Sequence, residues 1–325
     1  MEIPVKIQLV RRVWTFPLIS LAVLLFSAPV LSAGDAPPPP SPRFLIAPNR
    51  LPAMLKKGGV ILLSAQSKGE VAESGFVNDA IPIDVDDLTT MSEEPGIFTD
   101  FTAWSQYIGS FGIDNRSTVI VYDDGELKFA SRVRFLLNYF GVRRAYLLNG
   151  GFNALAALIA DGRLSITPPG VPVEASFDIS IQDRPIHLVD RDTVAAVVGS
   201  TSATLVDVRT PAEFAGCLLL PGITRGGHIP GARNLPVEQL LTPQADNDLL
   251  GFLDRPAKLN SIFRRFGLRI NDRIIVYCMD GAKSSLAAGA LIDAGFRNIS
   301  LYYLSYLDWQ SDPADLVESI GPCPE

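Results

Sequence analysis

The residue best placed for covalent chemistry is Cys278, which lies between a short apolar run and a stretch of helix-forming residues. The run Ile274 to Tyr277 is β-branched and aromatic, which is typical of a strand covered on both faces. The stretch from Leu286 to Ile292 is rich in alanine and leucine, and Gly295 ends the predicted helix. A cysteine at such a junction faces backbone N–H groups and the positive end of a helix dipole, which favours the thiolate. The pattern therefore predicts a nucleophile.

The loop after Cys278 is short and carries one basic residue, as a binding loop for a small anion would. Gly281 allows the positive φ angle that turns backbone N–H groups inward, and Lys283 is expected to lower the thiol pKa and to attract an anion. A cysteine phosphatase needs an arginine six positions after the cysteine, but Ser284 stands there, so phosphatase chemistry is disfavoured. We assign substrate binding to the loop residues Met279, Asp280, Gly281, Ala282, Lys283 and Ser284.

This loop resembles the active-site loop of the rhodanese family of sulfurtransferases, Cys-x-x-Gly-x-Arg/Lys-Ser, with Lys283 in the basic place. The segments LVDVRTPAEFAG (205–216) and GGHIPGARNLP (226–236) resemble the two signature segments that precede the loop in that family. The resemblance implies that the Cys278 thiolate takes a sulfur from a small anionic donor, thiosulfate or 3-mercaptopyruvate, and becomes a persulfide. Cyanide, a small thiol or a thioredoxin-like protein would then accept the sulfur. No metal or organic cofactor is implied.

Residues of the two signature segments are expected to support the loop. Asp207 follows a predicted strand, where its carboxylate can accept backbone N–H bonds or pair with Arg209. Arg209 is also predicted to help bind the donor. His228 lies in a turn rich in glycine and proline, so a hydrogen-bonded structural role is favoured over a catalytic one. Glu213 is expected to brace a helix or a loop.

The sequence departs from the tandem rhodaneses at positions that affect the donor. Members that use thiosulfate carry two basic residues in the loop, and those that use 3-mercaptopyruvate carry small neutral ones. This loop has Met279 and Asp280 instead, with Lys283 as its only cation. Both types usually place an arginine where this sequence has Glu213. Because acidic groups repel a doubly charged donor, we expect weak turnover of thiosulfate.

An internal repeat predicts two tandem domains. The segment VIVYD, ending at Asp123, recurs 155 positions later as IIVYC, ending at Cys278. Each copy alternates apolar strands with helical segments, which predicts an α/β fold of two tandem rhodanese-like domains, each a mostly parallel sheet flanked by helices. Since Asp123 replaces the cysteine, we expect the first domain to be inactive and structural. The clearest predicted elements are strands at 60–63, 119–122, 204–208 and 274–277 and a helix at 131–139.

Residues 1–33 have the pattern of a secretory signal peptide. Basic residues precede the apolar stretch 13–31, and Ala33 offers a small residue at the cleavage site. We therefore expect export, with the periplasm as the location, and the alternative is an uncleaved membrane anchor. A proline-rich tether, an inactive rhodanese-like domain, a linker and a catalytic rhodanese domain are predicted to follow at 34–47, 48–165, 166–186 and 187–320.

The composition narrows the possible partners. A net charge of -7 and a pI near 5.0 argue against nucleic acid. Two histidines and three scattered cysteines disfavour a zinc site. Cys217 is expected to be an inert apolar thiol, with resolution of a Cys278 persulfide as the alternative. Cys323 could pair with Cys217 or with another chain. We expect a monomer.

Two functional hypotheses follow from the sequence. The first is a sulfurtransferase with Cys278 as its nucleophile. The second is a noncatalytic rhodanese-fold module that binds a partner or senses oxidants through Cys278. Cys278 could also be a buried structural thiol without any chemical role. Gly281 and Lys283 favour the enzyme, whereas Asp280 and Glu213 keep the second hypothesis open. A persulfide that turns over would discriminate between them, because a sensor needs only reversible oxidation.

Overall fold

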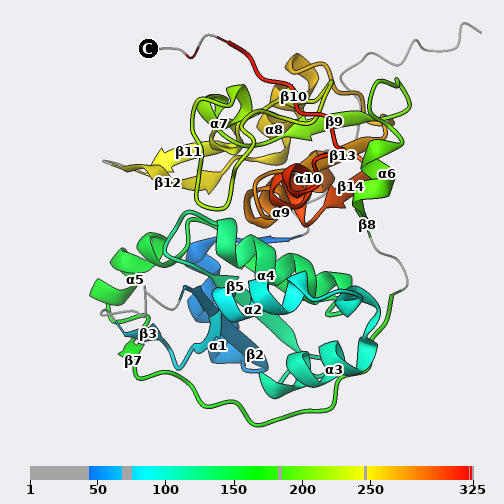
Figure 1. The fold of residues 1–325 in the computed structure, drawn as a ribbon. Coiled ribbons are helices and arrows are strands. Elements are labelled where there is room, and N and C mark those ends of the chain that lie inside the picture. The colour runs from blue at the N-terminus through cyan, green and yellow to red at the C-terminus, as the bar shows by residue number, and fades with distance from the viewer. Residues whose placement is uncertain (1–43, 68–74, 182–184, 245–246, 322, 324–325) are drawn as a thin grey trace, which may run out of the picture. The chain divides into compact units, whose positions relative to one another are not determined.

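Two five-stranded parallel sheets, one in each half of the chain, form the centre of the fold (Figure 1). The computed structural model describes residues 44–67, 75–181, 185–244, 247–321 and 323, all within one compact unit. The first sheet has the order β1-β6-β5-β2-β4, with β1 (Leu45–Ile46), β2 (Val60–Gln66), β4 (Ile81–Asp84), β5 (Thr118–Tyr122) and β6 (Ala145–Leu148). The second has the order β8-β14-β13-β9-β10, with β8 (Ile186–Val189), β9 (Thr204–Asp207), β10 (Arg233–Asn234), β13 (Ile274–Tyr277) and β14 (Ile299–Tyr302).

Helices fill the connections between the strands, because parallel neighbours need a long crossover. The helices of the first half are η1 (Pro48–Arg50), α1 (Leu51–Lys57), α2 (Val85–Glu93), η3 (Ile97–Thr99), α3 (Phe101–Ser110), α4 (Lys128–Tyr139), η4 (Phe152–Leu155) and α5 (Ala156–Ala160). Those of the second half are α6 (Arg191–Ala195), α7 (Pro211–Ala215), η5 (Val237–Leu240), α8 (Pro256–Arg265), α9 (Ala282–Asp293) and α10 (Ser305–Ser311). Two antiparallel pairs lie outside the sheets, β3 (Phe76–Val77) with β7 (Ile166–Thr167) and β11 (Leu241–Gln244) with β12 (Asn247–Leu253).

The predicted repeat and α/β fold are confirmed by the matching strand orders. The helices α4 and α9 each have 12 residues and begin at residues 128 and 282. The predicted strand at 274–277 is β13, and the other three predicted strands are observed with slightly different ends. The predicted helix at 131–139 begins earlier, at Lys128, because Leu127 takes a left-handed conformation that turns the chain into the helix.

The segment predicted as an interdomain linker, 166–186, packs along the first domain. Its first two residues form β7, which pairs with β3, and Phe177 is only 2% exposed in the core. Its last residue, Ile186, already belongs to β8. At the other end of the domain, β1 joins the first sheet, so the domain begins before residue 48. The described part of this segment, 166–181, is held to the first domain by backbone hydrogen bonds such as that from Gly170 N to Ala80 O.

The predicted signal peptide at 1–33 and most of the predicted tether lie outside the described residues. Within the part of the chain that the structure describes, no helix has both the length and the apolar character that crossing a membrane requires. Export and periplasmic location therefore stay predictions.

The two domains contact each other through the elements next to the repeated loops. The helix α4 of the first domain packs against α9 of the second (Figure 1). The β11–β12 hairpin of the second domain reaches the repeated loop of the first, where Gly251 N donates to Gly125 O at 3.2 Å. The Asn149 side chain accepts from Leu253 N at 2.8 Å and donates to Leu253 O at 3.1 Å. The second domain thus covers the loop of the first.

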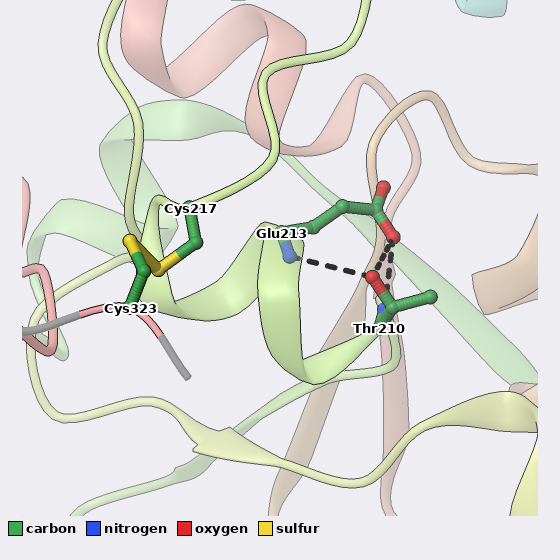
Figure 2. The surroundings of a disulfide bond; sticks show 4 residues. All are labelled: Thr210, Glu213, Cys217 and Cys323. Carbon is green, nitrogen blue, oxygen red and sulfur yellow. Dashed lines mark hydrogen bonds between the residues drawn. A yellow bond between two sulfur atoms is a disulfide. The ribbon is translucent and has the colours of Figure 1, made fainter. Parts of the chain in front are cut away.

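A disulfide joins Cys217, which follows α7, to Cys323 in the C-terminal tail (Figure 2). Their Cα atoms are 5.4 Å apart, although the two residues are separated by 106 positions in the sequence. Figure 2 also shows the reciprocal capping box of Thr210 and Glu213 that begins α7. The expectation of an inert thiol at Cys217 is therefore wrong. The alternative pairing with Cys323 is observed, and it leaves Cys217 unable to resolve a persulfide on Cys278.

Candidate active site

Cys278 ends the central strand of the second sheet and is nearly inaccessible. The strand β13 lies between β9 and β14, and its residues are buried on both faces, which explains its uniformly apolar sequence. It delivers Cys278, 1% exposed, to the C-terminal edge of the sheet, where ligands of parallel sheets usually bind. Cys278 N donates to Ser305 Oγ at 3.1 Å, and Gly281 N donates to Cys278 Sγ at 3.2 Å. The thiol is free.

Gly281 makes the tight turn that aims backbone N–H groups at the sulfur. Its φ angle is 94°, and the residue is the N-cap of α9, so the predicted positive φ is confirmed. A Cβ at this position would also lie 2.4 Å from the carbonyl oxygen of Tyr303. Glycine is therefore required both by the conformation and by the close approach of another backbone segment.

The first domain contains the same turn with a carboxylate in it. Leu127, which precedes α4 as Gly281 precedes α9, has a φ angle of 62°. Asp123 Oδ1 accepts from Gly125 N at 3.1 Å and Leu127 N at 3.0 Å, and Oδ2 accepts from Ala130 N at 3.1 Å. A carboxylate oxygen is two bonds from Cβ, as the outer sulfur of a cysteine persulfide is. The loop of the first domain therefore displays how this turn directs backbone N–H groups at an oxygen two bonds from Cβ.

Because α4 begins at residue 128 and α9 at residue 282, Leu127 corresponds to Gly281 and Ala130 to Ser284. The N–H groups of Gly281 and Ser284 are therefore the equivalent donors in the second domain. The Ser284 N–H and hydroxyl both act on Cys278 so as to lower the thiol pKa. The Ser284 hydroxyl is fully buried and, apart from this action on the sulfur, makes no hydrogen bond to any described residue. A persulfide anion on Cys278 would give this hydroxyl and the N–H groups a partner.

Asp123 should make the stability of the protein depend on pH. Burial, with a smaller contribution from Asp124, raises the pKa of Asp123 to about 7, against the effect of three backbone N–H groups. Its pKa in the unfolded chain is about 3.9, so the folded protein binds the proton more tightly. The resulting stabilisation is complete below pH 4 and is lost as the pH rises through 7, by as much as about 4 kcal/mol.

We therefore expect Asp123→Asn to gain stability relative to the parent protein as the pH rises from 4 to 8. Urea denaturation at several pH values measures this difference. The exposed Asp161→Asn is a matched control. If the difference between Asp123→Asn and the parent were constant across this range, the carboxylate would not be protonated near neutral pH.

The resting thiol is not predisposed to ionise. Burial raises the pKa of Cys278, and the charge of Asp280 raises it further, outweighing the opposing effects of Ser284 and the Asp280 N–H. Sγ lies 3.7 Å from Asp280 Oδ1, which places the S–H to donate to that carboxylate. The expectation that the loop favours the thiolate is therefore wrong for this resting geometry, because the loss of hydration exceeds the effect of the helix terminus.

Asp280 is held by an arginine of the first domain. Arg132, on α4, lies with Nη2 2.9 Å from Asp280 Oδ2 and donates to the Asp280 carbonyl oxygen at 2.5 Å. Burial pushes the pKa of Asp280 upward, but the Arg132 charge and Ala282 N–H together keep it below its usual value. The sequence analysis missed Arg132. The available signal was a pair of arginines, Arg132 and Arg134, within a helix that otherwise packs many apolar side chains.

Lys283, which we expected to attract the donor, is already paired. Its Nζ lies 2.9 Å from Glu238 Oε1 on η5. Burial lowers the pKa of Lys283, but the bond to Glu238 and the charges of Glu238 and Glu213 raise it overall, so the amine is protonated. Glu213 braces α7 as predicted, accepting from Thr210 N at 2.9 Å. The carboxylates next to Lys283 thus offset its charge, consistent with weak attraction for a dianion.

Arg209 and Asp207 pair as predicted, with Nη2 2.6 Å from Oδ2. Arg209 also donates to Gly227 O at 2.7 Å and lies 3.9 Å from the centre of the Tyr306 ring. The side chain is 3% exposed. These contacts tie the turn at Gly227 and the helix α10 to the end of β9. The contact of Arg209 with a donor stays a prediction.

The remaining predicted residues have structural positions. His228 stacks on Phe214 at 3.6 Å, and its Nδ1 lies 2.9 Å from Phe214 O, which fits the predicted turn role. Met279 O accepts from Leu307 N at 2.9 Å, which anchors α10 to the loop. Ala282 N donates to Asp280 Oδ1 at 3.2 Å. Over the described ranges, no cluster of acidic, histidine or cysteine side chains could hold a metal ion.

Comparisons with known proteins agree with the two-domain fold. A model of the rhodanese-like domain matches residues 47–158 and 190–312. A thiosulfate sulfurtransferase of Corynebacterium glutamicum is 30% identical over 280 residues, covering 82% of this chain and 88% of the relative. A thiosulfate sulfurtransferase of Cricetulus griseus is 30% identical over 210 residues, covering 63% and 67%. The solved structure of EanB has the same fold, with a TM-score of 0.70, 21% identity, and coverage of 86% of this chain and 70% of that chain.

Proposed function

We propose that this chain, which belongs to the rhodanese-like family and is a sulfurtransferase, moves a sulfane sulfur through a persulfide on Cys278. The observation that carries the proposal is the turn after β13. It presents the N–H groups of Gly281 and Ser284 where the first domain uses the equivalent groups to hold the Asp123 carboxylate. N–H groups aimed in this way favour negative charge on an atom two bonds from Cβ, as they do for Asp123 against the effect of burial.

The reaction would proceed in two displacements. In the first, the Cys278 thiolate attacks the outer sulfur of thiosulfate, the S–S bond of the donor breaks, and sulfite leaves with the bonding electrons. With 3-mercaptopyruvate, a C–S bond breaks instead, and the pyruvate carbanion takes the proton of the donor thiol. In the second, cyanide attacks the outer sulfur and leaves as thiocyanate, or a thiolate attacks and becomes a persulfide. Cys278 is returned as the thiolate in each case.

The charges around the loop bear on the choice of donor. The relatives named thiosulfate sulfurtransferases support thiosulfate as a donor. Near Cys278, however, Arg132 is balanced by Asp280, and Lys283 by Glu238, while Glu213 adds a further negative charge. We therefore propose a small anionic donor and expect the singly charged 3-mercaptopyruvate to load Cys278 faster than thiosulfate does. A thiol or a thioredoxin-like protein is the proposed biological acceptor.

We further propose that the protein is exported and acts as a monomer. The signal-like sequence at 1–33 motivates export, and the bond between Cys217 and Cys323 supports it, because disulfides persist mainly in oxidising compartments. Detection of the protein in a periplasmic extract, with its N-terminus starting after residue 33, would test this proposal. Recovery of the intact N-terminus in the membrane fraction would favour the anchored alternative.

Intact-mass measurement tests the proposed chemistry directly. The purified protein is treated with thiosulfate or 3-mercaptopyruvate and then with cyanide, and Cys278→Ser is treated in parallel. We expect a gain of one sulfur atom that cyanide removes, and no gain in the variant. If neither donor loads Cys278 while peroxide modifies it reversibly, the protein is instead a redox-responsive module.

A further inference from the structure

Arg132 reaches from the inactive domain to the loop that carries Cys278, and it binds that loop at two points. Its Nη2 lies 2.9 Å from Asp280 Oδ2 and donates to the Asp280 backbone carbonyl at 2.5 Å. Its other terminal nitrogen donates to Thr89 Oγ1 on α2. One side chain therefore fixes both the backbone and the carboxylate of the loop to the first domain.

The burial of Arg132 makes its charge effective at the neighbouring sulfur. The side chain is 2% exposed, whereas that of Asp280 is 37% exposed. Arg132 Nε is buried and has no hydrogen-bond partner among the described residues. The guanidinium also lies 5.9 Å from the centre of the Tyr303 ring. A charge removed from water in this way acts more strongly on its charged neighbours than an exposed charge does, because the surrounding dielectric is low.

Several charged or titratable groups face Cys278 from the surrounding elements. Asp280 belongs to the same loop, and the S–H can donate to its Oδ1. The others are Arg132 on α4, Tyr303 after β14, and Lys283 on α9 with its neighbours Glu238 and Glu213. Of the two cations, Arg132 contacts Asp280 itself, whereas Lys283 pairs with Glu238, so Arg132 is the cation that governs the effect of Asp280 on the sulfur.

We propose that Arg132 is a positioning residue for sulfur transfer, which holds the Asp280 carboxylate and the loop backbone so that the Cys278 sulfur can carry a negative charge. Without Arg132, the charge of Asp280 would favour the protonated thiol, which donates to its carboxylate, and would repel the thiolate and the persulfide anion. The first domain would then supply a charge that the second domain lacks at this position. The effect of Arg132 on the charge of the sulfur is independent of the proposed function, whereas its effect on sulfur transfer rests on that function.

The rate of alkylation of Cys278 by iodoacetamide tests the proposal without any sulfur donor. With Cys217 and Cys323 in a disulfide, Cys278 is the free thiol among the three cysteines of the chain. At a fixed pH below the thiol pKa, the rate follows the thiolate fraction. We expect Arg132→Gln to slow alkylation by roughly three- to tenfold and to shift the pH profile upward. Asp280→Asn should accelerate alkylation and shift the profile downward.

The double variant Arg132→Gln/Asp280→Asn separates this role from a merely structural one. Removing both charges should restore the alkylation rate to within about threefold of the parent protein. Arg132→Lys should also stay close to the parent, because it keeps the charge. Lys128→Gln removes a cation from the same helix, one that pairs with Glu126 and not with Asp280, and should leave the profile unchanged.

The proposal fails if Arg132→Gln and Asp280→Asn shift the profile in the same direction, or if the double variant is slower than Arg132→Gln. If Arg132→Gln does not fold, Asp280→Asn alone decides, and an unchanged profile would overturn the proposal. Loading by 3-mercaptopyruvate is measured on the same proteins. A parent protein that shows the expected alkylation pattern but never gains sulfur would refute the proposed function while leaving the role of Arg132 at the thiol intact.

Discussion

Replacing Gly281 by alanine is expected to slow persulfide formation on Cys278 by about 100-fold or more, the usual effect of losing one donor from an anion-binding site. Alanine would place Cβ 2.4 Å from the Tyr303 carbonyl oxygen. Because this oxygen belongs to the backbone directly after β14, it cannot move aside as the end of a flexible side chain can. The turn would have to shift, which carries Gly281 N away from Sγ, now 3.2 Å distant. The N-terminus of α9 would move with it. Stopped-flow or quenched loading by 3-mercaptopyruvate, read by mass, measures the rate.

Gly295→Ala is a closely matched control. Gly295 has a φ angle of 95°, nearly that of Gly281, but no described residue beyond its chain neighbours comes within 4 Å of the point where a Cβ would lie. Both variants therefore bear the strain of a left-handed alanine, about 1 kcal/mol, and only Gly281→Ala meets the Tyr303 backbone. Gly295→Ala should load at the rate of the parent protein. Equal rates for the two variants would show that the turn at Gly281 does not hold the reacting sulfur.

The active-site loop could be predicted from sequence because its requirements are local. A strand buried on both faces must be apolar throughout, as β13 is, and a helix that begins directly after a tight turn needs a residue at positive φ, as Gly281 provides. The repeat was equally visible, since Asp123 and Cys278 end matching strands. These features depend on residues close together in the chain.

The electrostatics of the site could not be predicted in the same way. The charge that faces Asp280 comes from Arg132, almost 150 positions away, and no local pattern reports that contact. The sign of the shift in the Cys278 pKa depends on how completely the sulfur is buried in the folded protein. The sequence suggested that Lys283 would act on the thiol, and the two charges do interact, but the direct partner of Lys283 is Glu238, from η5, at 2.9 Å.

Each domain contacts the repeated loop of the other. The first domain has its loop filled by the Asp123 carboxylate and covered by the β11–β12 hairpin through the contact of Gly251 with Gly125. In return, its helix α4 supplies Arg132 to the active loop. The first domain therefore contributes to the electrostatics of the second, because Arg132 is the cation that pairs with Asp280.

The double replacement Cys217→Ser/Cys323→Ser is expected to lower the free energy of unfolding by about 4 kcal/mol. A crosslink between residues 106 positions apart restricts the unfolded chain strongly, and a closed loop of that size stabilises by about 4.7 kcal/mol in the chain-entropy model. The loop encloses the strand β13, the loop after it and the helix α9. Urea denaturation without reductant should therefore show a lower midpoint for the whole transition, whereas Cys278→Ser should retain the parent midpoint.

The effect should be global because the tail is docked independently of its disulfide. Glu318 exchanges two backbone hydrogen bonds with His228, at 2.8 and 2.9 Å, and Ile320 N donates to Ala215 O at 3.2 Å. These contacts keep the folded tail in place, so the loss falls on the unfolded state, and persulfide loading should stay near the parent rate. Reductant should shift the parent midpoint to that of the double variant and leave the variant unchanged. If hydrogen exchange instead showed only the amides of Glu318 and Ile320 losing protection, with the midpoint constant, the disulfide would be a local clasp on the tail.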